Sequence, residues 1–110
     1  MTTATMLVYD LPMAQTAISS IGDIIRTHGA GRPQHTCLVE GTRELTWAET
    51  YENSQRVANG FAAAGVKADD RVALLDMNGI PHFEVGFGAA LINAVSVDVN
   101  WRLAAPEVEY

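Results

Sequence analysis

The chain has 110 residues, of which 48% are hydrophobic and 18% are charged, and its formal net charge is −6. A chain of this length forms one domain or part of one, with a modest hydrophobic core. Its acidic balance and its single lysine, Lys67, exclude the basic surface that the phosphate backbone of a nucleic acid requires.

Cysteine usage and apolar runs indicate the compartment. One cysteine, Cys37, excludes an internal disulfide framework, and its apolar neighbours predict a small core residue in a reducing environment. The N-terminus has no positive region before its short apolar stretch, which Asp10 interrupts, so it does not resemble a secretory signal. No apolar run approaches the ~18–20 residues of a membrane-spanning helix. We therefore expect a cytoplasmic protein without a transmembrane segment.

Residues 1–18 show no clean helical or strand period and predict an N-terminal arm. The apolar part of this arm lacks a basic face, which favours packing on protein over contact with a membrane. From residue 19 onward the pattern is that of a folded domain. Ser19 or Ser20 caps a first helix, Asp23 suits its positive end, and Gly29 is its predicted stop.

A small hairpin and a long helix follow. The hairpin is predicted from short strands at residues 36–39 and 43–45 around a Gly41 turn. Thr46 and Glu49 have the spacing of a capping box, in which each side chain bonds the other residue's backbone N–H. Gly65 and then Val66 predict a Schellman ending, with Gly65 in the left-handed conformation. The predicted buried stripe of this helix consists of Tyr51, Ser54, Ala58, Phe61 and Ala62.

The second half reads as strand, helix and strand. Residues 71–75 and 94–99 are short apolar runs that predict buried parallel strands. The helix between them, residues 83–92, is apolar nearly all round, and Gly86 and Gly88 allow a close approach. Asn93 is its predicted left-handed cap. A last helix begins near Pro106.

This order of elements predicts an α/β fold with a layered parallel sheet and right-handed crossovers. The sheet reads as incomplete, because parallel strands need cover on both faces and two helices are few for that task.

No motif for chemistry stands out in the chain. Its histidines, His28, His35 and His82, lack the spacing of metal ligands, and no Gly-x-Ser-x-Gly motif is present. The nine glycines are dispersed and form no phosphate loop after a strand. The acid pairs Asp69-Asp70 and Glu107/Glu109 suit a turn and a solvated helix face, respectively. We therefore predict no catalytic, cofactor-binding or metal-binding residue in this chain.

The run from Leu45 onward resembles the opening of the adenylate-forming enzymes, which include the acyl-CoA synthetases. Members of that family typically carry Leu-Thr-Tyr-x-Glu, a helix ending in Leu-Gly-Val, Gly-Asp-Arg-Val with an aliphatic strand, and then an Asn before an apolar helix. The matching residues are Leu45-Thr46-Trp47-Ala48-Glu49, Gly65-Val66, Asp70-Arg71-Val72-Ala73-Leu74-Leu75 and Asn78.

The resemblance continues through the last strand. The family shows Gly-Ala-Val, a strand, Asn-x-Arg-Leu and a Glu, and this chain carries Ala94-Val95, Asn100, Arg102-Leu103 and Glu107. Three positions depart from the pattern: Asp69 and Asn93 stand where glycine is usual, and Asp98 stands where proline is common.

The resemblance implies that residues 19–110 are the N-terminal part of the large AMP-binding domain of a fatty-acid–CoA ligase, with residues 1–18 as its arm. Such an enzyme activates a fatty acid or other carboxylate with ATP and Mg²⁺ to an acyl-adenylate and transfers the acyl group to coenzyme A. The residues that bind these groups lie later in the family, so the piece itself is expected to be an inactive scaffold. Its implied partners are the remainder of the parent enzyme and a second copy of it in a homodimer.

Two other interpretations stay open at this point. The chain could be a non-enzymatic interaction module of α/β fold that dimerises through its apolar surfaces. It could also be a complete small ligand-binding domain with a pocket at the carboxyl ends of its two parallel strands.

Overall fold

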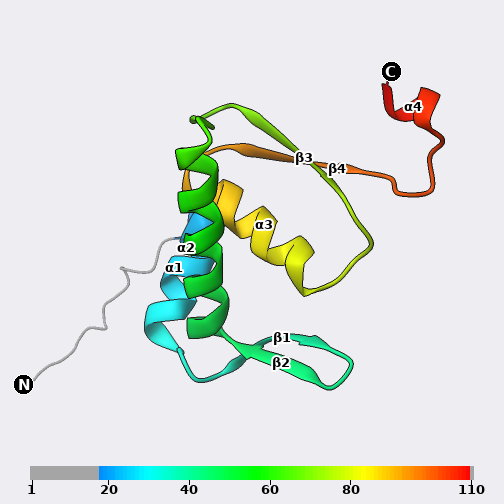
Figure 1. The fold of residues 1–110 in the computed structure, drawn as a ribbon. Coiled ribbons are helices and arrows are strands. Elements are labelled where there is room, and N and C mark those ends of the chain that lie inside the picture. The colour runs from blue at the N-terminus through cyan, green and yellow to red at the C-terminus, as the bar shows by residue number, and fades with distance from the viewer. Residues whose placement is uncertain (1–17, 110) are drawn as a thin grey trace, which may run out of the picture.

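A computed structural model describes residues 18–109, so the predicted arm lies outside the described residues apart from Ile18. Three helices pack together, a hairpin extends from them, and a pair of parallel strands leads to a short last helix (Figure 1). The elements in chain order are α1 (Ile21–Gly31), β1 (Thr36–Glu40), β2 (Arg43–Thr46), α2 (Trp47–Ala63), β3 (Arg71–Leu75), α3 (Ile80–Leu91), β4 (Val95–Val99) and α4 (Ala105–Glu109).

The strands form two separate sheets. β1 and β2 pair as the predicted antiparallel hairpin, and β3 pairs with β4 in parallel with α3 as the crossover between them. The α/β class and the parallel pairing are therefore confirmed. The hairpin does not join the parallel strands, so the parallel sheet is small.

Helix α1 begins as predicted but ends later. Ser20 is its N-cap and forms a capping box with Asp23. The predicted stop at Gly29 was wrong, because the helix continues to Gly31. Gly29 instead permits a close approach to the next helix, since an added Cβ would lie 2.8 Å from Cδ2 of Tyr51. Pro33, two residues beyond Gly31, is incompatible with a further helical turn.

Both ends of α2 have the predicted chemistry. The Glu49 N–H donates to Oγ1 of Thr46 at 3.1 Å, and the Thr46 N–H donates to Oε1 of Glu49 at 2.8 Å. At the other end the Val66 N–H donates to the Phe61 carbonyl at 3.0 Å while Gly65 has a φ of +94°. This is the Schellman ending that the sequence predicted.

The buried side of α2 differs from the predicted stripe. Thr50, Ser54 and Ala58 are buried, whereas Tyr51 and Phe61 are half-buried and Ala62 is exposed. The two hydroxyls tolerate complete burial because each donates to a carbonyl four residues earlier, at 2.9 Å for Thr50 and 2.7 Å for Ser54.

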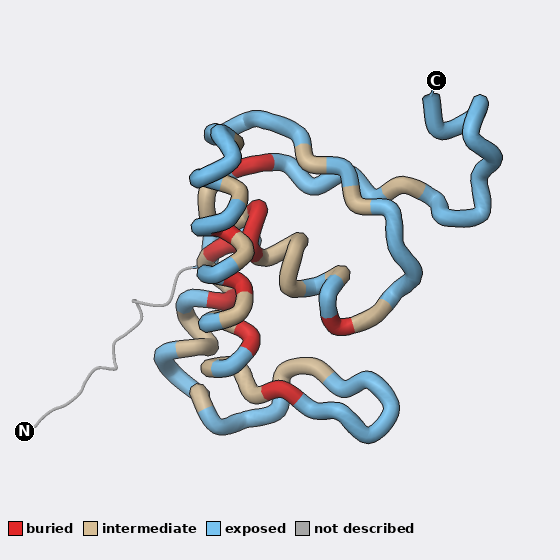
Figure 2. Tube along the Cα trace, viewed as in Figure 1, coloured by how far each residue is buried: buried red, intermediate tan, exposed pale blue. Residues whose placement is uncertain are grey.

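The core lies where α1, α2 and α3 meet (Figure 2). Its fully buried apolar side chains include Ile25 and Ile80. Helices α2 and α3 approach closely at Gly88, where an added Cβ would lie 2.6 Å from Cγ1 of Val57. The prediction that a glycine of this helix allows a close approach is confirmed for Gly88, whereas Gly86 has no heavy atom within 4 Å of such a Cβ.

The parallel strands are correctly placed, but the prediction that they are buried was wrong. Most of their residues are exposed. The reason is that α3 is the one helix, among those described, that packs against both strands. Their common start is tightly defined: Asp69 and Asn93 both have positive φ, 72° and 59°, and the Asp69 N–H donates to the Asn93 carbonyl at 2.8 Å. The two positions where the family usually has glycine thus require the left-handed conformation.

Candidate functional site

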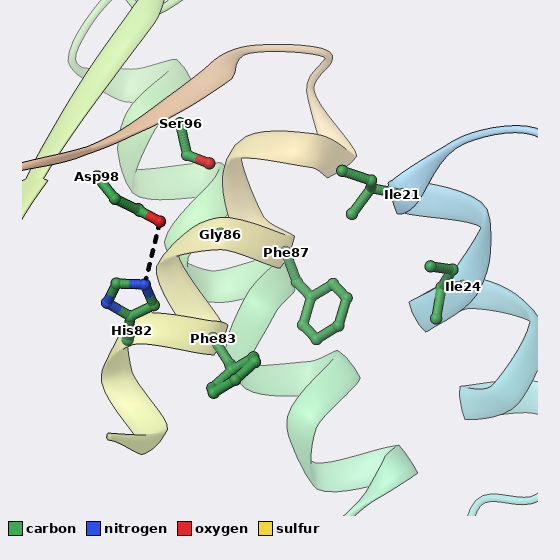
Figure 3. Close-up of a pocket in the computed structure, with 8 residues that line it drawn as sticks. All are labelled: Ile21, Ile24, His82, Phe83, Gly86, Phe87, Ser96 and Asp98. Carbon is green, nitrogen blue, oxygen red and sulfur yellow. Dashed lines mark ion pairs between the residues drawn. The ribbon is translucent and has the colours of Figure 1, made fainter. Parts of the chain in front are cut away.

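A cavity of about 390 Å³ lies between α1, α3 and β4 (Figure 3). Its lining consists of Ile21, Ile24, His82, Phe83, Gly86, Phe87, Ser96 and Asp98. Ile21 and Ile24 come from the first turns of α1, and the aromatic side chains come from α3. Because α3 is apolar nearly all round, it presents apolar side chains to this cavity as well as to the core.

The polar edge of the cavity joins α3 to β4. His82 Nε2 lies 3.4 Å from Oδ2 of Asp98, and the dashed line in Figure 3 marks this pair. The His82 side chain is 19% exposed and that of Asp98 is 65% exposed. Nδ1 of His82 is buried without a hydrogen-bond partner.

This edge does not form a nucleophile–base arrangement. One ring nitrogen of His82 faces Asp98 and the other has no partner, so neither is bonded to the Ser96 hydroxyl. The His82–Asp98 pair was not predicted from the sequence. The available signal was Asp98, which stands where proline is common in the family.

The other two histidines lie apart from this cavity. The ring of His28 packs on that of Trp47, with 4.7 Å between the centroids. Burial, and secondarily the charge of Arg32, lowers the pKa of His28. His35 is exposed. Within residues 18–109, no three His, Cys, Asp or Glu side chains come together in a group that could hold a metal ion.

The single cysteine is half-buried in β1, on the side of the hairpin that meets α2. Burial raises the pKa of the Cys37 thiol, while a hydrogen bond with Thr50 acts in the opposite direction. A thiol with a raised pKa is a poor nucleophile at neutral pH. The prediction that Cys37 is a buried core residue was wrong, because the residue is only half-buried at the hairpin.

The acid pairs occupy the predicted local positions. The Asp70 carboxylate accepts from the Lys67 N–H at 2.8 Å and closes the turn before β3. Glu107 accepts from the Ala104 N–H at 2.8 Å at the start of α4, and Glu109 is exposed.

The described residues do not form a binding site for a nucleoside triphosphate or its metal ion. Gly29 and Gly31 lie at the end of α1 and Gly86 and Gly88 lie inside α3, so neither pair opens a helix after a strand. Lys67 lies in the turn before β3, apart from the described cavity. Nor is any helix of the described part long and apolar enough to span a membrane.

Comparison with known proteins assigns the family. The family described as "AMP-binding enzyme" matches residues 25–110, which is more than half of the chain. The chain belongs to the AMP-binding enzyme family. The resemblance inferred from the sequence motifs is therefore confirmed, and the β3–α3–β4 unit of this AMP-binding chain lies wholly inside the matched region.

Curated relatives of the chain are ligases. The fatty acid–[acyl-carrier-protein] ligase ScoC of Streptomyces coeruleorubidus is 44% identical over 66% of this chain and 14% of its own length. The long-chain-fatty-acid–CoA ligase FadD13 of Mycobacterium tuberculosis is 35% identical over 84% of this chain and 19% of its own length. The chain thus spans less than a fifth of the length of either relative.

Solved structures show the same fold. The N-terminal domain of FACL13 from Mycobacterium tuberculosis matches with a TM-score of 0.78 at 35% identity, over 83% of this chain and 23% of that one. The anthranilate CoA ligase AuaEII, in complex with anthranoyl-AMP, matches with a TM-score of 0.79 at 28% identity, over 96% of this chain and 20% of that one.

Proposed function

We propose that this chain forms the N-terminal part of a fatty-acid–CoA ligase, which activates a carboxylate with ATP to an acyl-adenylate and transfers the acyl group to coenzyme A. The observation that carries the proposal is the family match over residues 25–110. The names of two relatives, a fatty acid–acyl-carrier-protein ligase and a long-chain-fatty-acid–CoA ligase, support a fatty acid as the substrate.

Within that enzyme the chain acts as a scaffold. Adenylation requires cations and oriented donors around a triphosphate. The described residues offer no group of metal ligands and no phosphate loop. We therefore assign the binding of ATP, Mg²⁺ and coenzyme A to residues outside these 110 and name no catalytic residue here.

The same proposal divides the chain into an arm, residues 1–18, and part of the large domain, residues 19–110. It places the enzyme in the cytoplasm, and it includes a homodimer as the assembly.

The test is fatty-acid-dependent exchange between ATP and labelled pyrophosphate, measured on the product of the complete coding frame and on the 110-residue chain. The expected result is exchange by the longer product with at least one acid of a C8–C18 panel, followed by thioester formation with coenzyme A. The 110-residue chain is expected to show no exchange.

Three outcomes would each contradict a part of the proposal. If a folded longer product shows no exchange with any acid of the panel, the proposed ligase activity is wrong. If the 110-residue chain itself shows exchange, the proposed scaffold role is wrong. If the longer product transfers the acyl group to a carrier protein and not to coenzyme A, the assigned acceptor is wrong.

A further inference from the structure

Two Asn-Gly pairs occur in the chain, Asn59-Gly60 and Asn78-Gly79. Asparagine loses its side-chain amide most readily when glycine follows it, because glycine has no side chain to hinder attack by its own backbone nitrogen. The two pairs lie in different backbone surroundings, so the fold decides which of them can react.

The first pair lies inside a helix. Asn59 and Gly60 belong to α2, in which each backbone N–H donates to the carbonyl four residues earlier. Helical side chains also tilt toward the N-terminus of the helix, so the amide of Asn59 points away from the nitrogen of the next residue. Both residues are exposed, so solvent reaches this pair, and the helical backbone is what protects it.

The second pair lies in the loop of residues 76–79 between β3 and α3 (Figure 1). Asn78 is exposed and Gly79 is half-buried. Gly79 is the N-cap of α3, so its N–H stands outside the helical ladder, and its backbone is extended, with a φ of −174°. Within residues 18–109, neither this N–H nor the Asn78 side chain makes a hydrogen bond. The attacking nitrogen and the amide are therefore both available.

We propose that Asn78 is a site of spontaneous deamidation in the folded protein, whereas Asn59 is protected. The Gly79 nitrogen bonds to Cγ of Asn78 and gives up its proton, and the side-chain amide leaves as ammonia. Water then opens the resulting five-membered succinimide at either carbonyl, which leaves aspartate or isoaspartate at position 78. No oxidant or reductant takes part. The inference goes beyond the proposed function and does not depend on it.

The modification acts on the start of α3. The Ile80 N–H donates to Oε1 of Glu40 at 3.0 Å, and a Cβ added to Gly79 would lie 3.0 Å from Oε2 of the same carboxylate. Isoaspartate adds a methylene group to the backbone just before this contact, and either product adds a negative charge near Glu40. We therefore expect deamidation to weaken the link between the hairpin and α3.

The test is peptide mass spectrometry on the folded product of the complete coding frame, after incubation at neutral pH. Trypsin separates the two pairs, because Lys67 and Arg71 lie between them. Conversion of the amide to an acid is expected at least about tenfold faster at Asn78 than at Asn59, since reaction at Asn59 requires local opening of α2. Fragment ions identify the converted residue.

Two controls separate the fold from the intrinsic reactivity of the pairs. In urea the two pairs are expected to convert at rates within about threefold of each other, because both backbones are then unfolded. Asn78→Gln keeps an amide but requires a larger, six-membered ring, so it is expected to abolish the reaction at this position. Asn59→Gln is the matched variant and should leave the reaction at Asn78 unchanged. Enzymatic methylation of the isoaspartate carboxyl gives a second readout, which Asn78→Gln alone should remove.

Equal conversion of the two pairs in the folded protein would overturn the inference. So would the absence of conversion at Asn78 in a folded protein whose urea-unfolded form reacts, because the loop would then protect the pair as the helix does. An isoaspartate signal that persists in Asn78→Gln would place the reactive residue elsewhere. If neither pair reacts in urea, the assumed reactivity of Asn-Gly in this chain is wrong.

Discussion

The Glu40 carboxylate accepts a hydrogen bond from the Ile80 backbone N–H, with 3.0 Å between Oε1 and N. Glu40 ends β1 and Ile80 begins α3, so this contact ties the hairpin to the helix that lines the cavity. The N-cap of α3, Gly79, makes no side-chain cap bond. A carboxylate from a distant element therefore satisfies the positive end of this helix.

Removing this remote cap is expected to destabilise the protein. Glu40→Ala should lower the free energy of unfolding by about 1 kcal/mol, the usual value of an N-cap. Urea denaturation measures it. The matched control is Glu44→Ala in the partner strand, whose carboxylate accepts from the exposed Thr36 hydroxyl, and about 0.5 kcal/mol or less is expected there. Equal losses in the two variants would show that Glu40 does not act as a cap.

Two glycines in helices should respond with opposite sign to alanine. Gly88→Ala places a methyl group against Val57 and the Ser54 carbonyl, and should lower the free energy of unfolding by about 1–3 kcal/mol. Gly60→Ala meets no atom within 4 Å in α2, and should raise it by about 0.5–1 kcal/mol. Thermal unfolding of both variants is the measurement. A stabilising Gly88→Ala would mean that α2 and α3 do not cross at this residue.

The partly buried ring of His28 makes stability depend on pH. Its pKa is lowered from 6.5, so the unfolded chain binds the proton more readily than the folded one. Stability from this group is therefore present above about pH 6.5 and is lost as pH falls through the lowered pKa. Urea midpoints between pH 5 and pH 8 measure this slope. His28→Phe keeps a ring against Trp47 and should flatten the slope, and an unchanged slope in this variant would assign it to other groups.

The thiol of Cys37 should react slowly while the protein is folded. Burial raises its pKa, so a smaller fraction is thiolate at any given pH than in the unfolded chain. The rate of reaction with a disulfide reagent, followed from pH 7 to pH 10, should rise at higher pH for the folded protein than for the same protein in urea. Coincident pH profiles would show that the Cys37 thiol is fully solvated.

Much of the local structure could be predicted from short sequence patterns. The capping box at Thr46 and Glu49, the Schellman ending at Gly65 and the hairpin turn at Gly41 all depend on residues within a few positions of each other. Their conformations follow from backbone sterics and hydrogen bonds between neighbours, so no tertiary information was needed.

Errors arose where a distant partner decides the outcome. Gly29 was predicted to stop α1, but it lies inside the helix, where it leaves room for Tyr51 of α2. The strands β3 and β4 were predicted to be buried from their apolar runs, yet burial requires a cover that the described elements supply on one face only. The His82–Asp98 pair joins residues 16 positions apart on a helix and a strand.

The sequence by itself therefore determined the element order, the caps and turns, and the family to which the chain belongs. These properties depend on local residue patterns and on the spacing of motifs. Only the tertiary structure decided which glycines allow helices to cross, which polar groups meet at the cavity, and which face of the parallel sheet stays open. Such properties depend on distances between segments far apart in the chain. Hydrophobic periodicity predicts which face of an element is buried, but it does not predict which segment covers that face.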